Sequence, residues 1–151
     1  MNSFEKSKIS LRYWLLGMAQ KDKEYLICLD AMEYAQKYHT GYRKDNITPE
    51  IEHQYKIAHY IRTLHNSLIY PVETLCTVFL HDIPEDYDVS IIEIENKFGK
   101  IIANSTEALT KCFRGSKKPD DIYFEGIAND PIASIGKGGD RMHNLQSMAG
   151  V

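Results

Sequence analysis

The densest group of side chains that could do chemistry is His81-Asp82, followed closely by Glu85 and Asp86. An adjacent His and Asp offer one imidazole nitrogen and one carboxylate oxygen to the same cation, which suits Mn, Fe, Co or Zn. In a helix, Glu85 lies four residues after His81 and three after Asp82, so it would face the same cavity. A solvated acidic helix end would show the same residues, so the dipeptide alone does not establish a metal site.

Two further candidates, His53 and Asp140, lie far from this group in the sequence. His53 falls one turn into a predicted helix, where it could equally be a partly buried or capping histidine. Asp140 could form a surface salt bridge with Lys137 or Arg141, but apolar neighbours such as Leu145 predict that its helix is largely buried. A buried carboxylate needs a partner, and a metal ion is one of the few adequate ones.

The elements that must position these residues are predicted to be helices, because helical periodicity dominates and strand-like alternation is scarce. Thr48-Pro49 predicts an N-cap followed by a first-turn proline, and Pro71 opens a helix in the same way. Ser90 fits a capping box, and Gly99 is expected to close the helix that follows. The expected helices cover residues 9–19, 24–39, 48–64, 71 to the proline at 84, 90–99 and 100–110, with a last helix after residue 131.

Residues 40–47 and 113–120 are expected to be loops, and the fold class is all-α. The 151 residues predict one domain, divided into an N-terminal helical extension over residues 1–22 and a main domain over residues 23–151. The net charge of −3 gives no indication of nucleic acid or an anionic membrane as a partner. The three cysteines form no paired spacing and no apolar run approaches about 18 residues, so we expect a cytoplasmic protein with reduced thiols.

His53, His81, Asp82 and Asp140 form the ordered pattern H…HD…D, which is that of the HD superfamily. Further matches between about residues 31 and 148 are His39-Thr-Gly-Tyr-Arg43-Lys44, Leu80-His-Asp-Ile-Pro-Glu-Asp86, Phe98-Gly99, Leu109-Thr110-Lys111 and Lys137-x-x-Asp140-Arg-Met-His-Asn144. This series resembles the hydrolase domain of the RelA/SpoT family and its stand-alone small alarmone hydrolases. The resemblance implies an HD-domain helical bundle.

The resemblance also implies a role for each matching residue. The four residues of the H…HD…D pattern would hold one divalent ion, which is manganese in this family. Glu85 and Asp86 would position and deprotonate the attacking water. Arg43 and Lys44 would contact the nucleotide, and Asn144 would lie against the nucleotide and the metal site.

Some positions depart from the family pattern. Glu50 and Gln54 stand where the family usually has Tyr and Pro, and Gly138 and Gly139 replace an apolar residue and alanine before the last predicted ligand. Ser147 falls where the family usually has a threonine near the ribose, so a hydroxyl is kept. The chain ends where the family has further helices, so the domain is expected to lack these C-terminal helices.

The resemblance therefore predicts a (p)ppGpp 3′-pyrophosphohydrolase of the stringent response, which yields GDP or GTP and pyrophosphate. No synthetase-like second domain is present in this sequence, so hydrolysis without synthesis is expected. The partner would be a small-molecule nucleotide, and the oligomeric state stays open. One alternative is an HD phosphohydrolase for another nucleotide, such as an adenosine alarmone, a dinucleotide phosphate or a signalling oligonucleotide. Another is a non-catalytic module that binds a nucleotide.

Overall fold

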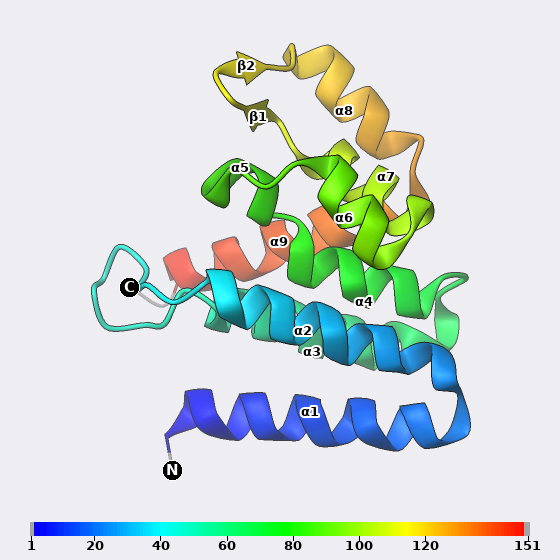
Figure 1. Ribbon diagram of the computed structural model, residues 1–151. Coiled ribbons are helices and arrows are strands. Elements are labelled where there is room, and N and C mark those ends of the chain that lie inside the picture. The colour runs from blue at the N-terminus through cyan, green and yellow to red at the C-terminus, as the bar shows by residue number, and fades with distance from the viewer. Residues whose placement is uncertain (1, 150–151) are drawn as a thin grey trace.

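The computed structural model describes residues 2–149, with side chains described as far as Gln146. The fold is all-α, as predicted (Figure 1). The helices are α1 (Ser3–Lys21), α2 (Leu26–Tyr38), α3 (Glu52–Leu64), α4 (Pro71–Leu80), α5 (Ile83–Tyr87), α6 (Ile91–Phe98), α7 (Lys100–Leu109), α8 (Asp120–Ala128) and α9 (Pro131–Ala149), with 3-10 turns η1 (Lys23–Tyr25) and η2 (His65–Ser67). Between residues 2 and 149, no helix is both long enough and apolar enough to cross a membrane.

Helix α4 is the central helix of the bundle. It packs against α2, α3, α7 and α9, and its residues from position 74 to position 80 are all buried. Leu75 and Phe79 are fully removed from solvent, and burying a side chain of this size contributes about 1.5–3 kcal/mol. The residues that follow directly after α4 are therefore attached to a firmly packed helix.

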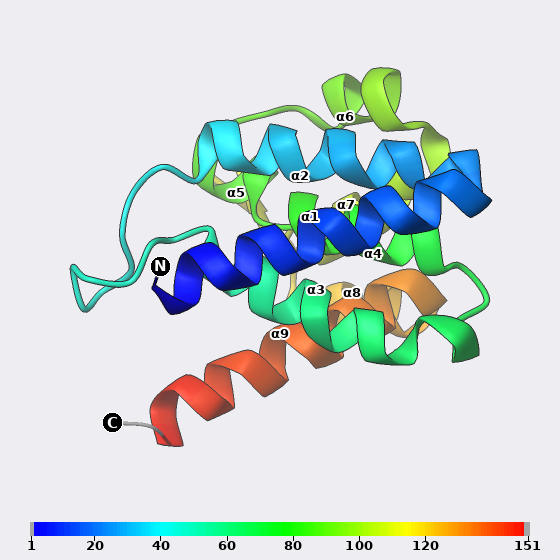
Figure 2. The ribbon, with the colours of Figure 1, turned by 90° about the horizontal axis from the view of Figure 1, so that it is seen from below.

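Helix α1 packs against α2 and α3, across which it lies in Figure 2. Leu11 and Leu15 are four residues apart, so they share one face of α1, and both are fully buried. His59 of α3 lies 3.0 Å from the Ser7 carbonyl oxygen of α1 through its Nε2 atom. The buried residues of α1 belong to the same apolar core as those of α2 to α4. The domain division after residue 22 stays a prediction.

Three of the predicted helix boundaries are confirmed. Pro71 is in the first turn of α4, where its missing N–H costs no helical hydrogen bond. The Ser90 hydroxyl oxygen accepts a hydrogen bond of 3.2 Å from the Glu93 backbone N–H at the start of α6. Gly99 ends α6 with φ at 91°, a backbone conformation that residues with a Cβ atom rarely adopt.

The predicted start of the third helix was wrong, because α3 begins at Glu52 rather than at Thr48-Pro49. The Thr48 hydroxyl and backbone N–H both donate to the carboxylate of Asp45, at 2.6 and 2.8 Å. Pro49 forms an isolated antiparallel bridge with Tyr42. These contacts lie within residues 42–49 and hold them as a loop, so the proline is part of that loop and not of α3.

The segment predicted as a loop at residues 113–120 contains a hairpin. Strands β1 (Cys112–Phe113) and β2 (Ser116–Lys117) pair antiparallel, and positive φ values at Arg114 and Gly115 form the turn between them. Helix α8 follows and was not predicted. Its buried residues Tyr123 and Ile127 are four apart and pack in a small cluster with Leu109 of α7.

Candidate metal centre

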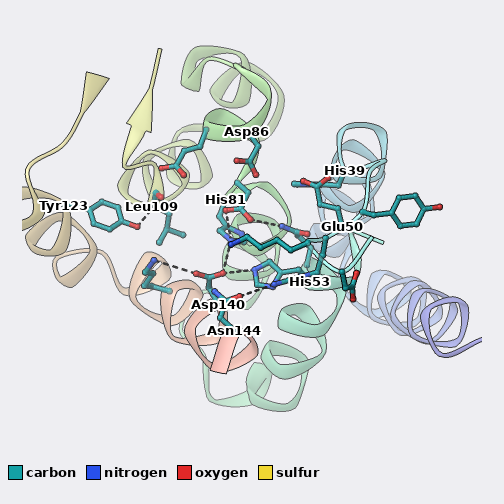
Figure 3. A pocket seen from close by; sticks show the side chains of 17 residues that line it. His39, Glu50, His53, His81, Asp86, Leu109, Tyr123, Asp140 and Asn144 are labelled. Atoms are coloured by element: carbon teal, nitrogen blue, oxygen red, sulfur yellow. Dashed lines mark hydrogen bonds and ion pairs between the residues drawn. The ribbon is translucent and has the colours of Figure 1, made fainter. Parts of the chain in front are cut away.

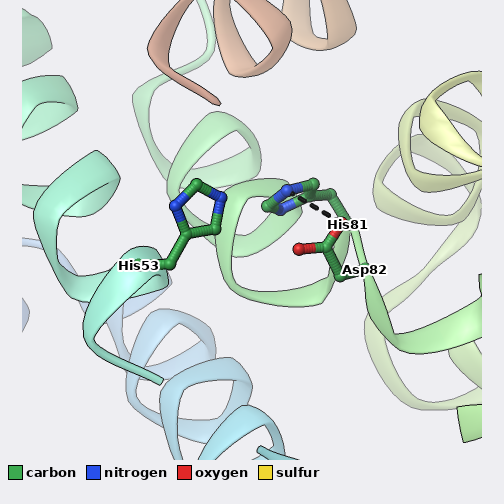
Figure 4. A group of neighbouring side chains, drawn as sticks. All are labelled: His53, His81 and Asp82. Atoms are coloured by element: carbon green, nitrogen blue, oxygen red, sulfur yellow. Dashed lines mark ion pairs between the residues drawn. The ribbon is translucent and has the colours of Figure 1, made fainter. Parts of the chain in front are cut away.

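The predicted ligands come from three helical elements that meet at α4. His81 and Asp82 follow directly after the last residue of α4, before α5 begins at Ile83. His53 lies in the first turn of α3, and Asp140 lies in the middle of α9. His53, His81 and Asp82 each offer one ligand atom, and these atoms lie within 4.8 Å of one another (Figure 4). Both histidines are buried.

Asp140 adds a fourth donor to this cluster. Its Oδ1 atom lies 2.7 Å from His53 Nε2 and 3.6 Å from His81 Nε2, and Asp82 Oδ1 lies 3.1 Å from the same His81 nitrogen. Ligand atoms bonded to a transition metal at about 2.1 Å and at right angles lie about 3 Å apart. These separations are near that value, and His53, His81 and Asp82 meet the mutual spacing that one divalent cation requires. The role of all four residues as its ligands stays a prediction.

The orientation of His81 also fits a metal ligand. Its Nδ1 lies 2.7 Å from the Val78 carbonyl oxygen, to which it donates a hydrogen bond. The other nitrogen, Nε2, therefore faces the cluster, as in histidines whose second nitrogen is fixed by a carbonyl. Despite the short distance to Asp82, this buried Nε2 atom has no partner of hydrogen-bond geometry in the part of the chain that the structure describes.

The charges in the cluster depend on one another. Burial alone would lower the pKa of His81, but the carboxylates of Asp82 and Asp140 outweigh it and raise the pKa to about 9. Burial opposes ionisation of Asp140, yet its hydrogen bond to His53 and the nearby charge of His81 hold the pKa of this carboxyl well below its usual range. Two ionised carboxylates thus face a shared positive charge on His81. A bound cation would replace the proton that gives His81 its positive charge.

Two of the predictions about α9 can be compared with the structure. The helix was expected to be largely buried, but Leu145 is 65% exposed, so this expectation was wrong beyond Asp140. Asp140 itself has only 14% of its side chain exposed. Lys137 Nζ lies 3.7 Å from Asp140 Oδ2, so the ion pair weighed as an alternative forms alongside the contacts to the histidines.

The cluster lies at a pocket of about 990 Å³, into which side chains of both charges point (Figure 3). Arg43, Lys44 and Asn144, all predicted to contact the nucleotide, line this pocket. Arg43 Nη2 donates a hydrogen bond of 3.4 Å to Asn144 Oδ1, which joins the loop at residues 42–49 to α9. Ser147 lies in α9, but its side chain is outside the described residues. A pocket of this size can hold a nucleotide.

Glu85 lines the pocket, but its carboxylate is engaged by the hairpin. Its Oε1 atom accepts hydrogen bonds from the backbone N–H groups of Lys111 and Cys112, the latter at 2.9 Å. Glu85 and His81 line the same pocket, as the helical spacing predicts. Through the two backbone N–H groups, Glu85 also connects α5 to the base of β1.

Asp86 also lines the pocket, although its side chain still meets solvent. Partial burial raises the pKa of Asp86, and the nearby carboxylates of Asp82, Glu50 and Glu85 raise it further, to about 6. A carboxylate with a pKa near 6 can accept a proton near neutral pH more readily than an ordinary one. Asp86 is therefore better suited than Glu85 to take a proton from a water molecule.

Sequence reasoning missed a polar wall on the α2 side of the pocket. The Tyr87 hydroxyl donates a hydrogen bond of 2.8 Å to Glu50 Oε1, and Nδ1 of the buried His39 lies 3.2 Å from the same oxygen. Gln54, next to His53, donates to Asp82 Oδ2 at 3.1 Å. The sequence signals for this wall were the departures from the family pattern at positions 50 and 54 and the match that begins at His39.

His143 precedes Asn144 in α9 and lies against the cluster. Its Nδ1 lies 2.6 Å from His53 Nδ1, so one ring donates a hydrogen bond to the other. Burial and the nearby charge of His53 lower the pKa of His143 to about 4, so its ring is neutral near pH 7. His143 therefore restricts the orientation of His53 from the side opposite Asp140.

Comparisons with known proteins agree with this geometry. The sequence profile described as "HD domain" matches residues 31–120. The chain is similar to a probable guanosine-3′,5′-bis(diphosphate) 3′-pyrophosphohydrolase of Synechocystis (29% identity, 82% of this chain) and to a guanosine-3′,5′-bis(diphosphate) 3′-pyrophosphohydrolase of Aquifex aeolicus (27%, 78%). It is also similar to the bifunctional (p)ppGpp synthase/hydrolase SpoT of Escherichia coli (28%, 82%).

The chain spans 17% of the length of each of these three proteins. The chain is also similar to a GTP pyrophosphokinase of Streptomyces coelicolor (24% identity, 78% of this chain, 14% of that protein). The matched HD segment contains His53, His81 and Asp82, and Asp140 lies beyond it. The chain belongs to the HD domain family of metal-dependent phosphohydrolases and resembles the hydrolase domain of the RelA/SpoT proteins.

Proposed function

We propose that this chain removes the 3′-pyrophosphate from (p)ppGpp, using one bound divalent cation, manganese, and releasing GDP or GTP. The observation that carries the proposal is the meeting of His53, His81, Asp82 and Asp140 at a nucleotide-sized pocket. The names of the relatives support the choice of substrate.

The four side chains would hold the cation, which lowers the pKa of a bound water and neutralises charge on a phosphoryl oxygen. Arg43, Lys44 and Lys137 line the same pocket and supply positive charge for the phosphates. The Arg43 guanidinium can fork onto two phosphoryl oxygens, whereas a lysine offers a point charge. These groups bind and orient the pyrophosphate before the bond is cleaved.

Asp86 would accept the proton of the attacking water, because its raised pKa places it near the working pH. General base catalysis of this kind is typically worth about 10²- to 10⁴-fold in rate. Glu85 holds the base of the hairpin through two backbone N–H groups, so its contribution would be to position α5 against β1. Asn144, held by Arg43, would contact the nucleotide after this contact opens.

The experiment is pyrophosphate release from ppGpp by the purified chain with manganese. The controls are an Asp82→Ala variant and the addition of a chelator. We expect turnover that both controls abolish. No turnover from a folded, manganese-loaded chain would overturn the proposal for this substrate. Turnover of another nucleotide in a parallel panel would then establish a different HD phosphohydrolase, and tight nucleotide binding without turnover would establish a binding module.

A further inference from the structure

Gln54 is an amide buried beside the metal cluster. It lies in the first turn of α3, directly after His53, and only 1% of its surface is exposed. Its Nε2 donates a hydrogen bond of 3.1 Å to Asp82 Oδ2. Its carbonyl oxygen, Oε1, is buried and has no hydrogen-bond partner among residues 2–146. The amide is therefore only half satisfied.

The chemistry of the neighbour determines which way the amide faces. An ionised carboxylate only accepts hydrogen bonds, so the NH₂ group must point at Asp82 and the carbonyl oxygen must point away. A buried acceptor without a partner costs free energy, whereas an apolar side chain of the same shape would avoid that cost. Gln54 therefore weakens the fold locally, and its side chain makes one hydrogen bond within the described part of the chain, to Asp82.

This hydrogen bond separates the two oxygens of Asp82. Oδ2 is held by Gln54, while Oδ1 lies 3.1 Å from His81 Nε2, on the side of the cluster. About 31% of the Asp82 side chain is exposed, so packing alone does not fix its rotation. One oxygen is restrained by the amide, and the other is presented to the place where a cation would bind.

We propose that Gln54 is a positioning residue for Asp82, which it holds in the orientation needed to ligate the metal. The inference rests on the proposed metal site. Gln54 lines the same pocket, and the role assigned to it here is exercised through Asp82. Groups of this kind, hydrogen-bonded to a metal ligand, typically change metal affinity or activity by about 10- to 100-fold when they are removed.

The test compares manganese affinity with the thermal stability of the metal-free protein. Gln54→Met replaces the amide by an apolar side chain of similar length. We expect manganese affinity, measured by electron paramagnetic resonance titration, to fall about 10- to 100-fold. The melting temperature of the metal-free variant should stay equal or rise, because an unsatisfied buried acceptor has been removed. A residue with only a structural role would give a lower melting temperature and an unchanged affinity.

Two further variants make the result decisive. Gln54→Asn keeps the amide but shortens its reach, so it should lose affinity as Gln54→Met does, which excludes an effect of the methionine sulfur. Gln36→Met is the matched control, because Gln36 donates to the Tyr55 hydroxyl at 2.7 Å and does not line the pocket. It should change stability and leave manganese affinity unaltered.

The outcomes separate this inference from the proposed function. If the wild-type chain binds manganese and both Gln54 variants bind it equally well, the positioning role is refuted and the metal site stands. If the wild-type chain binds no manganese, the metal site itself is refuted, and the role of Gln54 is refuted with it.

Discussion

Gly138 and Gly139 are neighbours in α9, but their surroundings differ. A Cβ atom added at Gly138 would meet no atom within 4 Å. One added at Gly139 would lie 2.8 Å from Cγ2 of Ile57 in α3, whose side chain is fully buried. Gly139 thus allows α9 to approach α3 closely, and this approach brings Asp140 to His53. Alanine substitutions at the two positions should therefore have opposite effects on stability.

The expected magnitudes follow from this geometry. Replacing a glycine inside a helix by alanine stabilises it by about 0.5–1 kcal/mol, and both variants share this gain. Non-bonded carbon atoms prefer a separation of about 3.5–4.0 Å, so Gly139→Ala must displace Ile57 or α9 by roughly 1 Å. Overpacking of this kind costs about 1–3 kcal/mol. Since the gain is common to both variants, the difference in their unfolding free energies should equal this cost.

The assay is thermal unfolding of both variants without metal, followed by manganese titration. For a domain of this size, 1 kcal/mol shifts the melting temperature by about 2–4 °C. Gly138→Ala should therefore melt about 1–4 °C above the wild type, and Gly139→Ala at least about 2 °C below Gly138→Ala. Gly139→Ala should also bind manganese more weakly, because Asp140 moves with α9. Equal melting temperatures for the two variants would refute the close-approach argument.

Three other perturbations test separate parts of the structure. Glu85→Ala should accelerate hydrogen exchange across residues 111–118, because two backbone N–H groups lose their acceptor. Unchanged exchange with a large loss of turnover would instead assign Glu85 to the catalytic step. Tyr87→Phe should lower the unfolding free energy by about 1 kcal/mol through loss of the hydrogen bond to Glu50, and an unchanged denaturation midpoint would contradict that contact. Burial lowers the pKa of His59 below its usual 6.5, so on acidification the unfolded chain takes up this proton before the folded chain does. The contribution of neutral His59 to the unfolding free energy should therefore be present above pH 6.5 and be lost as the pH falls below it. Melting curves of the wild type and His59→Gln between about pH 5 and pH 8 should therefore converge on the acid side, and a constant difference would exclude this linkage.

The parts of the fold that could be predicted from the sequence depend on local signals. Pro71, Ser90 and Gly99 each act on the backbone within one turn of their own position, so each marks a helix boundary correctly. The strands of the hairpin are only two residues long, too short for an alternating pattern to be visible. Thr48 was misassigned because its hydroxyl and its backbone N–H donate to the carboxylate of Asp45, which keeps it in the preceding loop.

The candidate site shows the same division between local and long-range information. His53 and Asp140 could be proposed from residue type and order, and the structure brings them within hydrogen-bond distance. The contact of Tyr87 with Glu50 joins residues 37 apart, and nothing in a local sequence window relates them. The attachment of Glu85 to the backbone of Lys111 and Cys112 joins residues 26 and 27 apart, so it is equally invisible in a local sequence window.

The separation of 87 residues between His53 and Asp140 has a consequence for the order of folding. Closing a loop of this length costs roughly 4 kcal/mol of chain entropy beyond a constant term. The complete ligand set therefore forms only when α9 docks on α3, which is a late, long-range step compared with the pairing of α3 and α4. A cation held by all four side chains would act as a removable cross-link between these helices. Its rate of release would then report how often α9 detaches from the rest of the bundle.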